Sequence, residues 1–195
     1  MGFRFIMWGF LFTMLSFRVQ GIDILPDFFG YILIATGLKR LSDSSPHFRS
    51  AIPWTFALFV LSLFEVYQRS SPFQLGYHVN TSVDSLFPLS GGALFGMLYS
   101  AVVLVLNLLV VHHICMGTAD VALNRGNPAF ADVAERRWAN YFMFKVLLIV
   151  SIVVVFMFKI PPLAILIVVG MLVYSVAIAI LMMTFMSEAD RVLGS

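Results

Sequence analysis

The sequence predicts an all-α protein, a polytopic membrane helix bundle of about six transmembrane helices in a single integral membrane domain, residues 1–195. Of the 195 residues, 61% are hydrophobic and only 11% are charged, whereas soluble domains carry about 25% charged residues. The apolar residues also occur in blocks of membrane-spanning length, separated by short polar clusters. The chain has too little polar surface for a soluble globule, so the lipid bilayer is its first expected partner.

Six apolar segments account for the six helices. They cover residues 3–18, 25–41, 48–67, 91–117, 139–158 and 161–186. The last four are each about 20 residues or longer, which is enough to cross roughly 30 Å of hydrocarbon at 1.5 Å per residue. The first two are shorter and interrupted by polar residues, so we expect two short helices at the start of the bundle.

The distribution of Lys and Arg predicts the orientation. Basic residues gather in the connections after the second and fourth segments and near both termini: Arg4, Lys39, Arg40, Arg49, Arg125, Arg136, Arg137 and Arg191. The other side holds only Arg18, Arg69 and Lys159. Because cytoplasmic connections carry the excess of Lys and Arg, both termini are expected in the cytoplasm (N-in/C-in), at a cell membrane that the chain crosses several times.

Two connections are long enough to be features of their own. Residues 69–90 form the predicted outer loop, and residues 118–138 a cytoplasmic helical hairpin. In this hairpin Gly126 is a helix stop, Asn127 a cap and Pro128 a first helical residue. The hairpin is expected to project beyond the bilayer as a surface for a membrane partner protein, formed by Arg136, Arg137 and Trp138.

The most polar stretch inside the apolar half of the chain surrounds Pro26. Pro26 starts the second helix with Asp27 in its first turn, where free N–H groups and the helix dipole favour a carboxylate, and Asp23 caps the preceding turn. Because both flanking helices are short, this turn could instead lie below the membrane surface, with Arg18 as counter-ion. Arg18, Asp23 and Asp27 are therefore the candidate polar centre, and Gly30 would serve close packing.

Two histidines are the residues that could ligate a metal. His112 and His113 are adjacent, so on a helix their side chains point about 100° apart and cannot share one ion as an i,i+4 pair can. Capping of a helix end at the interface is the preferred interpretation, and neither a metal nor a cofactor is expected. The single cysteine, Cys115, excludes an intramolecular disulfide and a C-x-x-C site.

Small and polar residues inside the segments predict helix packing. Gly92, Gly96 and Ser100 recur at intervals of four, a close-packing pattern that also allows a homo-oligomer. Asn107 is expected to form a hydrogen bond between helices. Lys145 lies one to two turns into the fifth segment, where its long side chain can reach toward the cytoplasmic interface.

Two stretches resemble a group of uncharacterised small multi-pass membrane proteins of bacilli and clostridia. D-I-L-P-D-F-F-G-Y-I-L-I-A-T-G-L-K-R-L at 23–41 carries the D-I-L-P-D-F-x-G-Y signature of that group, and residues 113–138 end in its R-R-W. The resemblance implies a similar topology and a bacterial source. It transfers no activity and no catalytic residue.

The functional expectation is a non-enzymatic membrane protein that binds or transports a small solute or ion, or that supports a partner as a scaffold. The chain contains no nucleotide-binding loop, no H-E-x-x-H and no G-x-S-x-G, and no basic tract suggests nucleic acid. The alternative is an integral-membrane enzyme that acts on a lipid or isoprenoid substrate through Asp23 and Asp27.

Overall fold

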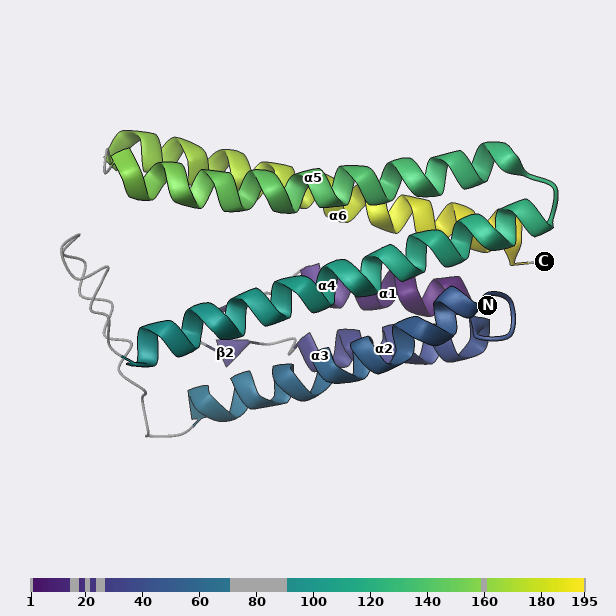
Figure 1. The fold of residues 1–195 in the computed structure, drawn as a ribbon, viewed down its shortest axis with the longest axis horizontal. Helices are drawn as coiled ribbons and strands as arrows, with labels where there is room; N and C mark the ends of the chain where they lie inside the picture. The colour runs from purple at the N-terminus through teal and green to yellow at the C-terminus, as the bar shows by residue number, and fades with distance from the viewer. Residues whose placement is uncertain are drawn as a thin grey trace.

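The computed structural model describes residues 2–14, 18–19, 22–23, 27–70, 91–158 and 161–194. Over these ranges the protein is all-α with six helices, as predicted (Figure 1). The helices are α1 (Gly2–Met14), α2 (Asp27–Leu41), α3 (Pro46–Ser70), α4 (Gly91–Asn124), α5 (Pro128–Phe158) and α6 (Pro161–Leu193). Between α1 and α2 in the chain, β1 (Arg18–Val19) and β2 (Ile22–Asp23) pair antiparallel.

Proline and glycine define several helix ends. Helices α3, α5 and α6 each begin at a proline, whose fixed φ suits the first turn and whose missing N–H would have no partner there. Gly126 has φ 72° and donates to Leu123 O, while Asn127 N–H reaches back to Ala122 O, which is a Schellman ending of α4. The Asn127 side chain then accepts from Phe130 N–H at 3.1 Å, so the predicted stop and cap are both present.

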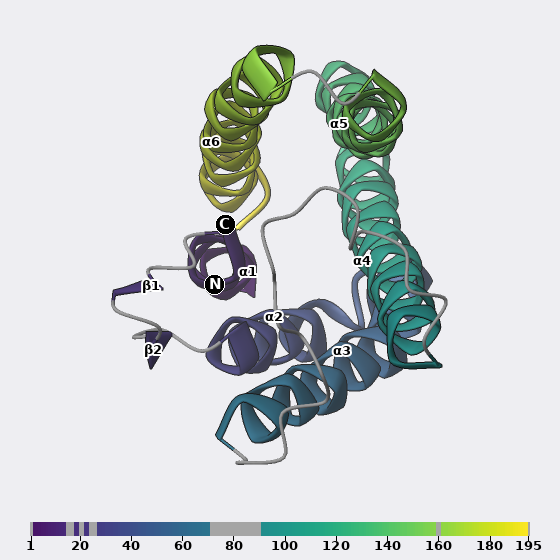
Figure 2. The ribbon, with the colours of Figure 1, turned by 90° about the vertical axis from the view of Figure 1, so that its left-hand side faces the viewer.

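The six helices form a closed ring. Each helix packs against the next one in the chain, and α6 packs back against α1. Figure 2, which views the bundle along its long axis, shows α1, α2, α3, α4, α5 and α6 following one another around this ring. Segments from the two ends of the sequence therefore become neighbours.

Glycines set the contact between α1 and α2. Gly2 and Gly9 on α1, and Gly30 and Gly37 on α2, are each seven residues apart, or about two helical turns. A Cβ on Gly9 would stand 2.8 Å from the carbonyl oxygen of Gly30, and a Cβ on Gly37 the same distance from that of Gly2. The two backbones thus approach too closely for any larger residue, and the expected packing role of Gly30 is confirmed.

One end of the bundle is basic. Both termini, the α2–α3 connection and the α4–α5 turn lie at the right-hand end of Figure 1. We call this the basic end, because the chain near these points carries Arg4, Lys39, Arg40, Arg49, Arg125, Arg136, Arg137 and Arg191. The arrangement agrees with the predicted placement of both termini on one side.

Two helices within the described residues are long and apolar enough to cross a membrane. They are Leu98–Asn124 in α4 and Val169–Leu193 in α6, with mean hydropathies of 2.0 and 2.2, and α1 adds a shorter apolar helix, Gly2–Thr13. Only 22% and 28% of the two apolar windows is buried inside the protein. They therefore differ from the core helix of a soluble protein, which hides most of its apolar surface.

Candidate functional site

The helix ring surrounds a cavity of about 260 Å³. Five helices line it, all except α3, and their described lining residues combine apolar side chains with a polar minority. The polar side chains are Thr13 on α1, Tyr31 on α2, Asn107 on α4, Tyr141 and Lys145 on α5, and Ser175 on α6. One ordered water takes up about 30 Å³, so the cavity has room for a small organic molecule or a cluster of waters.

Lys145 is the one charged side chain among the described residues that line this cavity. Its ammonium lies 5.3 Å from the ring centre of Tyr141 and 5.6 Å from that of Phe144. Both distances are within the roughly 6 Å over which an aromatic face attracts a cation. Lys145 therefore lines the cavity beside two aromatic rings, and its reach toward the cytoplasmic interface stays a prediction.

Asn107 lies on the same cavity wall and differs from its prediction. Its side-chain amide donates to Val103 O at 3.0 Å, one turn earlier in α4, and not across to another helix as expected. An asparagine side chain has a second N–H and an acceptor oxygen besides that bond. Asn107 can therefore offer a donor or an acceptor to a molecule in the cavity.

The cavity chemistry favours a small anion. Lys145 supplies positive charge, hydroxyl groups of Thr13, Tyr141 and Ser175 supply hydrogen-bonding capacity, and no carboxylate occurs among the described lining residues. Apolar walls with a few convergent polar groups are typical of ligand sites. A carboxylate or a comparable anion would balance the charge of Lys145 without competition from an acidic side chain of the wall.

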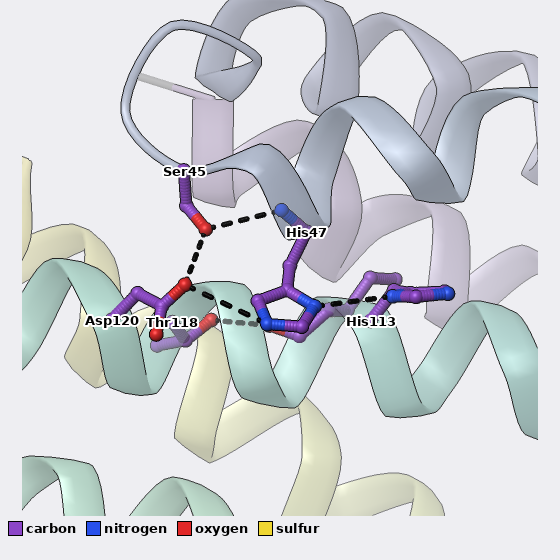
Figure 3. Close-up of polar contacts among 6 residues, drawn as sticks. Ser45, His47, His113, Thr118 and Asp120 are labelled. Atoms are coloured by element: carbon purple, nitrogen blue, oxygen red, sulfur yellow. Dashed lines mark hydrogen bonds and ion pairs between the residues drawn. The ribbon is translucent and has the colours of Figure 1, made fainter.

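A second polar cluster lies where α3 begins against α4 (Figure 3). Ser45 is the residue before α3; its hydroxyl accepts from His47 N–H at 3.2 Å and donates to Asp120 Oδ2 at 2.7 Å. His47 Nε2 lies 3.8 Å from the same Asp120 oxygen, and His47 Nδ1 lies 3.3 Å from Nδ1 of His113. We call Ser45, His47, His113 and Asp120 the α3–α4 polar cluster.

This cluster has Ser, His and Asp but not the geometry of a nucleophilic triad. A serine nucleophile needs its hydroxyl next to a histidine nitrogen that accepts the proton. Here the Ser45 hydroxyl donates to Asp120 and contacts the backbone, not the ring, of His47. Ser45 is also only 3% exposed, so the structure gives it the role of a helix cap.

The predicted polar centre is described only in its backbone. Arg18 and Asp23 are directly opposite each other in the β1–β2 ladder, and Asp27 is the first residue of α2. Their side chains lie outside the described part of the structure, as do residues 71–90 of the predicted outer loop. The cluster of the Arg18, Asp23 and Asp27 side chains therefore stays a prediction. The structure shows only that the backbones of Arg18 and Asp23 are paired.

The two candidate metal-ligating histidines face different neighbours. His113 meets His47 from α3, whereas the His112 ring packs edge-on against Trp138 with 4.8 Å between ring centres. His112 Nδ1 is buried and has no hydrogen-bond partner. Among the described residues no group of three His, Cys, Asp or Glu side chains is arranged to hold a metal ion.

The proposed partner surface is divided by the fold. Arg136 is exposed, but Arg137 and Trp138 are half-buried, and Trp138 packs against the hydrophobic core. Arg137 Nε is a buried donor without a partner. Of the three residues, Arg136 is the most exposed, and the partner surface stays a prediction.

The predicted small-residue packing face on α4 is only partly described. Ser100 is exposed and Gly96 half-exposed, while the surroundings of Gly92 lie outside the described side chains. A homo-oligomer through this face stays a prediction. Among the described glycines, those of α1 and α2 meet each other's helix closely, and Gly117 of α4 lies close to the Phe48 ring of α3.

Comparison of the chain with protein-family models, with curated proteins and with solved structures finds no match in any of the three. The assignment of a function rests on the site itself. The sequence predicted for Lys145 only a reach toward the cytoplasmic interface and no cavity, although a lone lysine in an apolar run is a signal of a functional site when the run lies in a membrane.

Proposed function

We propose that this chain is a multi-pass membrane protein, with six spans and both termini in the cytoplasm, that binds a small anionic solute in the cavity of its helix ring. The observation that carries the proposal is Lys145, which lines a cavity of about 260 Å³ whose described walls contain no carboxylate. The solute-binding class is one that the composition already favours. The position of Lys145 in the cavity wall supports a negative charge on the solute.

The outward surface supports a bilayer as the solvent of this protein. All six helices carry exposed large apolar side chains, among them Trp8, Phe29, Phe56, Val102, Val150 and Leu172. Soluble monomers rarely expose contiguous apolar patches beyond a few hundred Å². A ring of helices that is apolar on its outside and holds its polar groups at its centre and its ends suits hydrocarbon surroundings.

The basic end supports the orientation. It gathers both termini and the two connections that are rich in Lys and Arg, and such connections stay on the cytoplasmic side of a membrane. Helices α1 and α2 have 13 and 15 residues and are therefore about 20 and 22 Å long. Both are shorter than the roughly 30 Å hydrocarbon layer, so the α1–α2 connection would lie below the outer surface.

The energetics favour an anion over a neutral solute. A lysine inside a transmembrane helix costs about 2.5–3.5 kcal/mol on insertion scales. The aromatic faces of Tyr141 and Phe144 offset part of this cost, since a cation–π contact is worth about 0.5–2 kcal/mol. A bound carboxylate would offset the remainder, because Coulomb attraction is strong where water is excluded.

The test is binding of matched charged and neutral probes to the purified protein in nanodiscs. Isothermal titration calorimetry with benzoate and acetate should give saturable binding, whereas benzamide and acetamide, which have nearly the same shape, should bind at least tenfold more weakly. Lys145→Gln should weaken benzoate binding at least tenfold, and Lys145→Arg should retain more of it. Arg136→Gln, which removes an exposed cation from the same helix, serves as the control and should bind like the wild type.

Three results would contradict the proposal. They are equal affinity for benzoate and benzamide, unchanged benzoate binding in the Lys145→Gln protein, and wild-type protein that binds none of acetate, benzoate, chloride or phosphate. The Lys145→Gln protein must elute as a single species on gel filtration, so that a loss of binding reports on the charge and not on misfolding.

A further inference from the structure

The α3–α4 polar cluster brings together two histidines from different helices. His47 lies in the first turn of α3 and His113 in the C-terminal half of α4, 66 positions apart in the chain, with their Nδ1 atoms separated by 3.3 Å (Figure 3). Two nitrogens at this distance either share a proton in a hydrogen bond or turn both lone pairs toward a third atom. The distance by itself allows both arrangements.

The spacing matches that of two ligands on one metal ion. Imidazole nitrogens bind Zn²⁺ at about 2.0–2.1 Å, and tetrahedral angles then place two of them about 3.3–3.4 Å apart. The adjacency of His112 and His113 still prevents that pair from sharing an ion. The partner of His113 comes from α3 instead, which no spacing within one helix could reveal.

The neighbours of His47 favour the tautomer in which its Nδ1 can bind a metal ion. Asp120 Oδ2 lies on the other side of the ring, 3.8 Å from Nε2, and its negative charge favours the proton on Nε2. Nδ1 then keeps a free lone pair. A carboxylate behind a histidine is the usual outer support of a metal ligand, and Ser45 holds this carboxylate in place with a 2.7 Å hydrogen bond.

The remaining ligands would come from solvent. The side chains of His47 and Asp120 are 37% and 38% exposed, so water can reach the cluster. Within the described residues no third metal-ligating side chain joins the pair. Such a site holds its ion by two protein ligands and keeps open positions, which suits reversible binding of a borderline metal ion.

We propose that His47 and His113 form a two-histidine site for a divalent transition-metal ion, with Zn²⁺ as its representative, supported from behind by Asp120. The ion would link the start of α3 to α4 at the basic end of the bundle. This inference is independent of anion binding at Lys145, because the two sites share no residue.

The experiment measures Zn²⁺ affinity of metal-free protein, purified without a polyhistidine tag, by competition with a chromophoric chelator. Wild-type protein should bind one Zn²⁺ per chain. His47→Ala and His113→Ala should each weaken binding at least tenfold, and Asp120→Asn should weaken it less. The chain has four histidines in all, and the two outside the proposed site serve as matched controls. His112→Ala and His78→Ala should bind Zn²⁺ like the wild type.

The proposal is overturned if the wild type binds no Zn²⁺, if His47→Ala binds as tightly as the wild type, or if His112→Ala loses as much affinity as His113→Ala. All variants are compared on gel filtration and in thermal unfolding without metal. Where a histidine variant gives no folded protein, electron paramagnetic resonance of the Cu²⁺-loaded wild type decides. Hyperfine splitting from two bound imidazole nitrogens supports the site, and its absence rejects it.

Discussion

Lys145 is the residue on which the proposed charge preference of the helix ring depends. It stands near two aromatic rings, and the described walls of its cavity offer hydroxyls and an amide but no carboxylate. The rings attract the ammonium without neutralising it, so the site keeps its positive potential for a ligand. That is the physical basis for proposing an anion as the solute.

Ser45 provides a prediction at the same scale. Its hydroxyl caps α3 through His47 N–H and orients Asp120, and Ser-to-Ala changes at caps cost about 0.5–2 kcal/mol. Ser45→Ala should therefore lower the free energy of unfolding by about 1–2 kcal/mol in a denaturant titration in detergent. Ser42→Ala is the control, since the Ser42 hydroxyl bonds only to Lys39 O of the preceding helix, and its effect should stay below about 0.5 kcal/mol. An equal loss of unfolding free energy in the two variants would contradict the capping role of Ser45.

At the scale of elements, the α1–α2 pair depends on its glycines. Gly9→Ala puts a methyl group against Ile34 and 2.8 Å from the Gly30 carbonyl oxygen, and overpacking of this kind costs about 1–3 kcal/mol. The variant should unfold at a lower denaturant concentration than the wild type. Gly170→Ala on α6 is the matched control, because a Cβ there meets nothing within 4 Å. If both substitutions behave alike, close approach of α1 and α2 is not what the glycines provide.

The hairpin at the α4–α5 turn is held by tertiary contacts. Phe130 near the start of α5 stacks on Phe185 of α6 with 5.7 Å between ring centres, and both are buried. Deletion of residues 118–138, the predicted projecting hairpin, would remove Phe130 and expose Phe185. Arg136→Ala is therefore the sharper test of a partner surface than removal of the hairpin.

Phe130→Ala tests that contact directly. Loss of a buried phenylalanine costs about 3–5 kcal/mol in a packed core, so the variant should lose several degrees of melting temperature or fail to accumulate. Phe142→Ala removes an exposed phenylalanine of the same helix and should change the melting temperature little. A hairpin that projects freely would instead make the two substitutions equivalent.

For the whole molecule, the ring and its basic end predict the topology. In a Cys115→Ala background, new cysteines at Asp43 in the α2–α3 connection and at Arg125 in the α4–α5 turn should react with a membrane-impermeant maleimide only after the cells are opened. A cysteine at Ser82, in the predicted outer loop, should react in intact cells. Labelling of all three positions from one side would contradict six crossings.

The six helices follow from local rules. Pro46, Pro128 and Pro161 begin helices and Gly126 ends one, because their backbone preferences act within a few residues. Apolar runs alone ended the fourth segment at residue 117 and began the fifth at 139, whereas α4 continues to Asn124 and α5 starts at Pro128. The first predicted segment extended to residue 18, whereas α1 covers Gly2–Met14 and Arg18 pairs in the β1–β2 ladder.

The site depended on contacts that no local rule contains. Lys145 meets Asn107 and Ser175 around one cavity only because α4, α5 and α6 close a ring with α1 and α2. His47 and His113 meet because α3 packs on α4. The sequence predicted six helices and the proline and glycine positions at which several of them begin or end, since these depend on neighbouring residues, although apolar runs alone misplaced some helix ends. Which polar side chains face one another was left to tertiary packing, because that depends on rotations and contacts between helices far apart in the chain.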